Sequence, residues 1–393
     1  MFSKHPIVNK SLFNINRDIP IDSVGIHGKI YKIDTFNHPG GNTFLEINKG
    51  CDITTLYETH HINTEVSNKE LNKLKVTGHY KPVINYNFDY YNNLRSNVFK
   101  LFNTKKSRTM NTLTRLNLFF YIIICIYVHY KLLKYNYYNI DIYFIPICII
   151  SSVINSILGG FGHNGVHRLL YSTLLLDWNG LSSLEWLLEH VHSHHMYTNT
   201  NYDHDSISNT CGKHLIFLIA ELAVSIQGNI IHKFRWSILF NNKYPAWIRL
   251  SPFLFIIRIL SHILYQGLIF GLFNLILCLS FAGYYFSYLA HLNHVNINNV
   301  NYNNLNKICF ISHQIENTND LKINNYLSHI FLNLNKQKMH HLFPTIDHSH
   351  LHKIYKLIET DNKFIDIDLK AKSINFLNCE LNNMLTLFSF KTI

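Results

Sequence analysis

The sequence predicts a small α+β domain that precedes an all-α membrane domain with four transmembrane helices. Three observations carry this prediction. Residues 1–80 are polar and hold short alternating apolar runs, later stretches are apolar over lengths that can span a bilayer, and histidines cluster beside those stretches. Of 393 residues, 47% are hydrophobic and only 15% are charged, which excludes a disordered or coiled-coil chain.

Charge and cysteine content narrow the class of protein further. The net charge is +11, but no dense basic patch is interleaved with aromatic residues, so we expect membrane-flanking cations and no nucleic-acid partner. The seven cysteines lie far apart without a CxxC pair, which argues against a disulfide framework and a zinc-thiolate site. The N-terminus has no uninterrupted apolar core after its positive charges, so we expect no cleaved signal peptide.

The small domain over residues 1–80 is the first predicted element, and its alternating run at residues 26–33 indicates β-strand. It contains GKIYKIDTFNHPGG at residues 28–41 and GCDITTLYETHH at residues 50–61. These segments resemble the haem-binding motif of the cytochrome b5 fold, in which an HPGG turn precedes a helix that leads to a second histidine. The resemblance implies haem b held by two axial imidazoles, which passes electrons without binding oxygen.

The register of this motif makes His38 and His61 the haem ligands, with His60 one position too early. The glycines after Pro39 allow the backbone to approach a porphyrin closely. Three residues depart from the family pattern without removing a ligand: Tyr57, Ile53 and Lys32.

Three apolar stretches predict the four transmembrane helices. Residues 116–130 and 140–161 each predict one helix, and residues 250–292 predict a pair joined by a tight turn. The first span reaches a sufficient length only by including Lys131 and Lys134, whose charged ends would have to extend to the membrane surface.

Basic residues at 105–115 precede the first span and predict the topology. The positive-inside rule places the N-terminal domain in the cytosol, and four crossings return the C-terminal segment to that side. The expected organisation is a haem-binding domain at 1–80, a linker at 81–115, a membrane domain at 116–360 and a tail at 361–393.

Histidine is the most unusual component, with 26 histidines against 24 acidic residues. Residues 190–195 hold four histidines, where the overall frequency predicts fewer than one. A lone histidine is more often an ordinary packed side chain, but local enrichment favours metal ligation. The three clusters contain His163 and His167; His190, His192, His194 and His195; and Gln337, His340 and His341.

The spacing within the clusters predicts a two-metal centre. Histidines four positions apart share a helix face, so we expect His163 and His167 to aim at one point, and likewise His190 and His194. The adjacent pair at residues 340–341 would point about 100° apart, which suits contact with two metals. Even without His192, the seven remaining clustered histidines are too many for one tetrahedral zinc, and imidazole binds iron, zinc, copper and nickel.

The clusters read HNGVH, HVHSHHMYTN and QKMHHLFP, and they resemble the three histidine boxes of membrane fatty acyl desaturases. With the N-terminal motif, the resemblance is to front-end desaturases that carry a fused cytochrome b5 domain, in which glutamine opens the third box. Related desaturases use a further histidine after the fourth span, for which we favour His294 over His291, and we expect His192 to be no ligand. The implied ligands are His163, His167, His190, His194, His195, His294, Gln337, His340 and His341.

Three departures from the family pattern concern residues around the ligands. Asn164 replaces the usual aspartate of the first box, and Lys338-Met339 replaces the common Ile-Glu of the third. Asp203-His204-Asp205 stands where Asp-Pro-Asp is usual. These changes put the surroundings of the metals in doubt but leave the ligands in place.

The resemblance implies two iron ions, with O2 as co-substrate and NADH as electron source through a cytochrome b5 reductase. The expected partners are a long-chain acyl lipid, acyl-CoA or sphingoid substrate and the endoplasmic reticulum membrane, with the active site and N-terminus in the cytosol. Two alternatives remain open. One is a lipid hydroxylase with the same di-iron centre, and the other is a haem-containing zinc-binding or transport protein.

Overall fold

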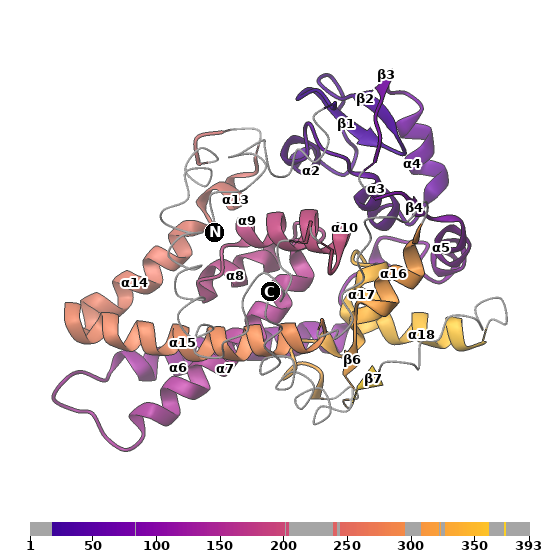
Figure 1. Ribbon diagram of the computed structural model, residues 1–393. Helices are drawn as coiled ribbons and strands as arrows, with labels where there is room; N and C mark the ends of the chain where they lie inside the picture. The colour runs from indigo at the N-terminus through magenta and orange to yellow at the C-terminus, as the bar shows by residue number, and fades with distance from the viewer. Residues whose placement is uncertain are drawn as a thin grey trace, which may run out of the picture.

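The computed structural model shows a small strand-containing unit beside a set of long helices (Figure 1). The tail expected at residues 361–393 lies outside the described part of the chain, apart from one short strand. The described residues are 18–82, 84–200, 202–203, 239–241, 244–294, 308–321, 323, 327–360 and 373–374.

The N-terminal unit is an antiparallel three-stranded sheet in the order β1-β2-β3, covered by short helices. The run at residues 26–33, expected as strand, contains a hairpin turn, because His27 and Gly28 both adopt positive φ. The run therefore divides between two paired strands. The elements are β1 (Ser23–Ile26), β2 (Lys29–Lys32), α2 (Thr43–Ile47), α3 (Thr54–His60), α4 (Thr64–Leu71) and β3 (Val76–His79).

Four helical segments among the described residues are long and apolar enough to cross a membrane, as predicted. The first extends past Lys131, whose ammonium lies 5.5 Å from the centre of the Tyr127 ring, while that of Lys134 lies 4.3 Å from the Tyr130 ring. The segments are α6 (Thr112–Leu133), α7 (Phe144–Val166), α13 with α14 (Ala246–Gln266) and the part of α15 (Leu268–Leu292) that spans Leu268–Phe286.

The spans pack as a bundle in which α7 contacts α6 and α15, and α14 lies against α15. The turn between α14 (Pro252–Gln266) and α15 falls at Gly267, which has φ +79° and so favours glycine. We expected the second span to end at residue 161, before the first histidine cluster, but α7 continues through His163 to Val166. The apolar span and the first histidine box are thus one rigid element.

The segment between the N-terminal unit and the first span is not a free linker. Its helix α5 (Asp89–Leu101) buries Tyr91, Leu94 and Val98 completely. They share an apolar core with Phe310 and with Met339 of the third histidine box.

A second apolar core joins the N-terminal unit to the second histidine box. Leu56 and Tyr57 of α3 pack in it with Leu188 and Val191, which precede and lie within that box. The N-terminal unit is therefore packed against the histidine-rich region and not held by its chain connection alone.

The remaining described elements are short. Two pairs of two-residue strands are parallel, β4 with β5 and β6 with β7. The elements are β4 (Tyr86–Asn87), η1 (Lys106–Arg108), η2 (Tyr171–Thr173), α8 (Leu174–Asn179), α9 (Ser183–Trp186), the π-helix η3 (Leu187–His194), α10 (His195–Tyr197), α13 (Ala246–Leu250), β5 (Ile308–Cys309), α16 (Phe310–Glu316), β6 (Asp320–Leu321), η7 (Leu334–Lys336), α17 (Gln337–Leu342), η8 (His348–His350), α18 (Leu351–Thr360) and β7 (Ser373–Ile374).

Candidate metal centre

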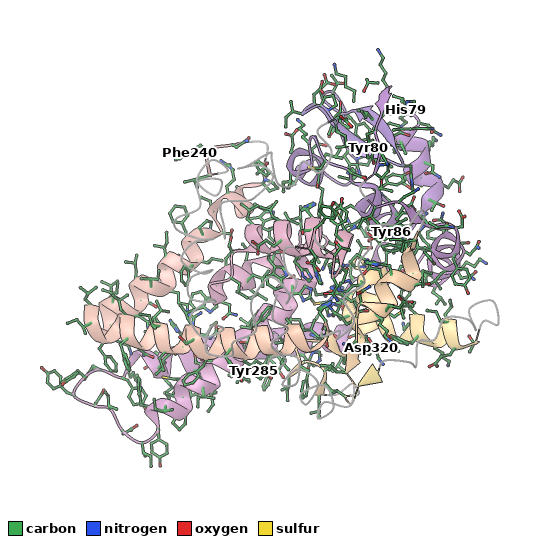
Figure 2. All side chains as sticks on the ribbon, viewed as in Figure 1. His79, Tyr80, Tyr86, Phe240, Tyr285 and Asp320 are labelled. Carbon is green, nitrogen blue, oxygen red and sulfur yellow. The ribbon has the colours of Figure 1, made fainter. Side chains whose placement is uncertain are left out.

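The three histidine clusters converge where the end of α7, the η3–α10 segment and α17 meet. Side-chain nitrogens gather at this place in the middle of the molecule (Figure 2). They form two groups, and within each group one ligand nitrogen per residue lies within 4.8 Å of the others. The first histidine group is His163, His167, His190, His195 and His340, and the second histidine group is His194, His294 and His341.

Distances within the groups match imidazoles that share a cation. The Nε2 atoms of His163 and His340 are 3.1 Å apart, as are those of His190 and His195. The Nε2 atoms of His194 and His294 in the second histidine group are 3.3 Å apart. Two nitrogens bound at about 2.1 Å to one ion lie about 3.0 Å apart at a right angle and about 3.4 Å apart at a tetrahedral angle. The observed spacings fall in that range.

The π-helical turn decides which histidines of the second box act together. We expected His190 to pair with His194, four positions on, but His190 belongs with His195, five positions on. A π-helix brings residues i and i+5 into line, whereas an α-helix aligns i and i+4. The expectation failed because the sequence alone does not reveal the wider turn over Leu187–His194.

Neighbouring histidines serve opposite groups, as the helical geometry predicted. His194 lies in the second histidine group and His195 in the first. On α17, His340 lies in the first and His341 in the second. The η3–α10 segment and α17 therefore each contribute histidines to both groups, so the two groups lie next to each other. The ring centres of His340 and His341 are 5.9 Å apart.

Burial keeps the ring nitrogens uncharged and ready to bind a cation. It lowers the pKa of His167, His190, His195, His340 and His341 well below the usual value, and neighbouring histidines lower each pKa further. A neutral imidazole has one nitrogen lone pair free for a metal. Both nitrogens of His167 are buried without a hydrogen-bond partner, an arrangement that costs stability unless an ion is bound. The donor set therefore fits two imidazole-bound metal ions.

Residues outside the expected ligand set orient the ligands, and of these only Asp203 was singled out in the sequence. Nδ1 of His341 donates to Oε1 of Gln314 at 2.9 Å, and Nδ1 of His194 donates to Asp203 at 2.9 Å. His348 hydrogen bonds through Nε2 to Nδ1 of His340 at 2.9 Å. Such contacts fix the ring so that the other nitrogen, Nε2, faces the metal.

Asn164, which stands where the family usually has aspartate, donates a hydrogen bond to the carboxylate of Asp347. Asp347 is fully buried and also lies 3.6 Å from the guanidinium of Arg168. A carboxylate is therefore present beside the first box, although it comes from the segment after the third. The HLFPTIDH stretch contains Asp347, and only its similarity to the family could have pointed to this residue.

The remaining expected ligands occupy distinct places. Gln337 lies beside the second histidine group, where its Nε2 is 3.1 Å from Nε2 of His294 and its buried Oε1 has no hydrogen-bond partner. His294 belongs to that group, while the side chain of His291 lies outside the described part of the chain. His192 is buried but belongs to neither group.

The expected haem ligands face each other in the N-terminal unit. The ring centres of His38 and His61 are 5.8 Å apart. Imidazoles bound at about 2 Å on opposite sides of one iron have ring centres about 6 Å apart. Nδ1 of His61 donates to the Tyr57 carbonyl at 2.9 Å, and Nδ1 of His38 lies 3.1 Å from both the Gly41 carbonyl oxygen and the Gly40 amide nitrogen. These contacts engage the Nδ1 atoms and leave both Nε2 atoms for an axial bond. This pair fits a bis-histidine haem.

Comparisons with known proteins agree with the histidine boxes. The family model described as fatty acid desaturase matches residues 140–365, which include every member of both histidine groups. The chain is 24% identical to "Probable Delta(5) fatty acid desaturase C" of Dictyostelium discoideum over 395 aligned residues, covering 86% of this chain and 84% of that protein. It is 27% identical to "Delta(5) fatty acid desaturase A" of the same organism over 204 residues, covering 46% of this chain and 42% of the relative. The chain belongs to the fatty acid desaturase family.

Proposed function

We propose that this fatty acid desaturase is a front-end enzyme with its own haem-binding electron donor. It would insert a double bond between an existing double bond and the carboxyl end of a long acyl chain, or into a sphingoid chain. The observation that carries the proposal is the division of the histidine boxes into two adjacent groups, in which every histidine except the half-buried His294 is buried. A structural histidine cluster needs no such division, whereas a two-metal oxidase does.

The ligands we propose are the eight histidines of the two groups together with Gln337. Two iron ions held there would supply, with O2, the oxidising power that side chains lack for removing hydrogen from an unactivated methylene. The residues of the chain hold those ions in place: Gln314, Asp203 and His348 fix ring orientations, and burial keeps water from the reacting centre.

The electron supply we propose begins at NADH and passes through a cytochrome b5 reductase to haem b on His38 and His61. The facing rings and their backbone hydrogen bonds support this assignment. We further propose the division into residues 1–80, 81–115, 116–360 and 361–393, and an endoplasmic reticulum location with the active site and N-terminus in the cytosol. The basic cluster before the first span supports that orientation.

The substrate class follows from the relatives and from the four spans. Two of the relatives are named as Delta(5) fatty acid desaturases, and four helical segments of the described chain are long and apolar enough to cross a membrane. We propose a long-chain polyunsaturated acyl lipid or acyl-CoA as the first substrate to test.

Expression in yeast supplied with candidate polyunsaturated or sphingoid chains, followed by mass spectrometry of the lipids, tests the function. We expect a product two hydrogens lighter, absent with His340→Ala and present with His352→Ala, an exposed histidine on α18. A hydroxylated product would establish the hydroxylase alternative. No new product from any chain, in cells that contain the haem-loaded protein, would contradict the proposal.

A further inference from the structure

His60 is a partly buried histidine for which the proposed reaction has no use. It ends α3 and directly precedes His61, the proposed haem ligand. The two rings face opposite ways: His61 faces His38, whereas the ring centre of His60 lies 6.4 Å from that of His167 in the first histidine group. One peptide unit therefore separates a ring of the haem site from a ring beside the metal centre.

The surroundings of the His60 ring satisfy only one of its nitrogens. Nε2 of His60 is buried without a hydrogen-bond partner, and Nδ1 is 3.1 Å from the Thr59 hydroxyl. The ring of Phe44 on α2 has its centre 5.6 Å from that of His60 and 5.7 Å from that of His192 in the second box. Burial lowers the pKa of His60 to about 3, so the ring is neutral.

The end of α3 is held firmly against the rest of the molecule. Arg95 of α5 donates to the carbonyl of Glu58 at 2.7 Å and to that of His61 at 3.4 Å. It also forms a buried ion pair with the Glu58 carboxylate at 2.7 Å. Because α5 shares its apolar core with α16 and α17, this clamp fixes the position of His60 relative to the metal centre.

We propose that His60 is a positioning residue for electron transfer. The route from the haem to the first histidine group runs from His61 through the peptide bond to His60 and then through the His60 ring. The inference rests on the proposed function, since it needs both cofactors. Each transfer oxidises ferrous haem to ferric haem and reduces the metal centre by one electron. Two transfers, two electrons and two protons from the acyl chain, and two protons from water convert O2 to two waters.

Geometry favours His60 over a route through solvent or through domain movement. Electron tunnelling weakens steeply with distance and weakens faster across a gap than through bonded or packed atoms. The route from His61 to His167 contains covalent bonds except for one contact between rings. A shared apolar core holds the two rings at this distance, because it packs Leu56 and Tyr57 against Leu188 and Val191. Electron transfer to the metal centre therefore requires no movement of the N-terminal unit.

The test uses detergent-purified full-length protein loaded with haem and iron. The haem is reduced anaerobically with NADH and reductase, then mixed in a stopped-flow instrument with O2 and acyl substrate, and its reoxidation is followed by absorbance. The variants are His60→Leu and His60→Gln, which remove the ring, and His60→Phe, which restores one. His79→Leu is the matched control, since His79 is exposed on β3 at the far edge of the sheet (Figure 2).

We expect His60→Leu and His60→Gln to keep the low-spin haem spectrum while reoxidation slows at least tenfold, with recovery in His60→Phe and no change in His79→Leu. Reoxidation within twofold of wild type in either ring-less variant would overturn the inference. Loss of the low-spin spectrum in those variants would also overturn it, because His60 would then be a haem ligand. Wild-type protein whose haem reoxidises no faster than an iron-depleted sample would instead refute the proposed electron supply, and the inference with it.

Discussion

Replacing Gln314 by leucine should weaken metal binding in the second histidine group, although no proposed ligand is substituted. Gln314 is fully buried on α16, accepts from Nδ1 of His341 at 2.9 Å and accepts from the Thr198 hydroxyl at 3.0 Å. It also donates to the His195 carbonyl at 3.3 Å. Leucine has a similar volume but cannot accept a hydrogen bond, so His341 loses the contact that fixes its ring.

The expected magnitude follows from the three hydrogen bonds that Gln314 makes. Removing a hydrogen-bond partner that orients a metal-bound histidine typically lowers metal affinity or activity by about 10-fold to 100-fold. The His195 carbonyl loses the Gln314 donor, at a cost of about 1–3 kcal/mol to stability. The Thr198 hydroxyl keeps its hydrogen bond to the His194 carbonyl at 2.7 Å. We therefore expect Gln314→Leu to fold, to hold less iron in its second histidine group, and to make at least tenfold less product.

Iron content by mass spectrometry and product yield per haem, measured on the same preparation, check this expectation. Gln314→Glu is the matched variant, because a carboxylate still accepts from Nδ1 of His341. It should retain more iron than Gln314→Leu. Iron content and product yield within twofold of wild type in Gln314→Leu would show that this hydrogen bond does not orient the ligand.

Three further outcomes are expected. Leu94→Ala, at a fully buried site on α5, should lower the free energy of unfolding by about 2–5 kcal/mol. Leu101→Ala, at the exposed end of the same helix, should leave it unchanged. Equal unfolding temperatures of the two variants would mean that α5 is a flexible linker that does not stabilise the fold. Burial lowers the pKa of His313 to about 4, so the unfolded chain takes up a proton at this residue before the folded chain does. The free energy of unfolding of metal-free protein should therefore fall by about 1.4 kcal/mol per pH unit for each such histidine as the pH drops from about 6.5 toward about 4. A free energy of unfolding that stays constant down to pH 5 would contradict this. His61→Ala should abolish the low-spin haem spectrum and His60→Ala should keep it; the reverse result would move the ligand by one position.

The four membrane helices were predictable because bilayer thickness imposes a length and a hydropathy that few other elements share. The first span shows the limit of that reasoning. Hydropathy alone treats the charge of Lys131 as the end of the span, yet Lys131 lies within α6. Its long side chain places the ammonium 5.5 Å from the centre of the Tyr127 ring.

The histidine centre was predictable in membership but not in pairing. Spacing of four residues implies a shared face only on an α-helix, and the π-helix at Leu187–His194 changes the partner of His190. No local pattern marks such a turn. It is stabilised by packing, since Leu188 and Val191 on it are fully buried against the N-terminal unit.

The residues around the ligands were missed for a related reason. Gln314 and Asp347 act on side chains that are distant in the sequence or belong to another box, and neither stands in a recognisable spacing. The role of α5 was also missed, because a polar stretch rich in tyrosine and asparagine resembles a linker until Tyr91 and Leu94 are seen in the core.

The measurement that most directly tests the central claim is the non-haem iron content of freshly purified full-length protein, determined with Mössbauer spectroscopy to show whether the irons interact. If the two histidine groups hold adjacent metals, the protein should contain two coupled non-haem irons per chain. His195→Ala and His341→Ala, one change in each group, should each lose the coupling. Zinc without iron, or a single uncoupled iron that survives both substitutions, would contradict the claim.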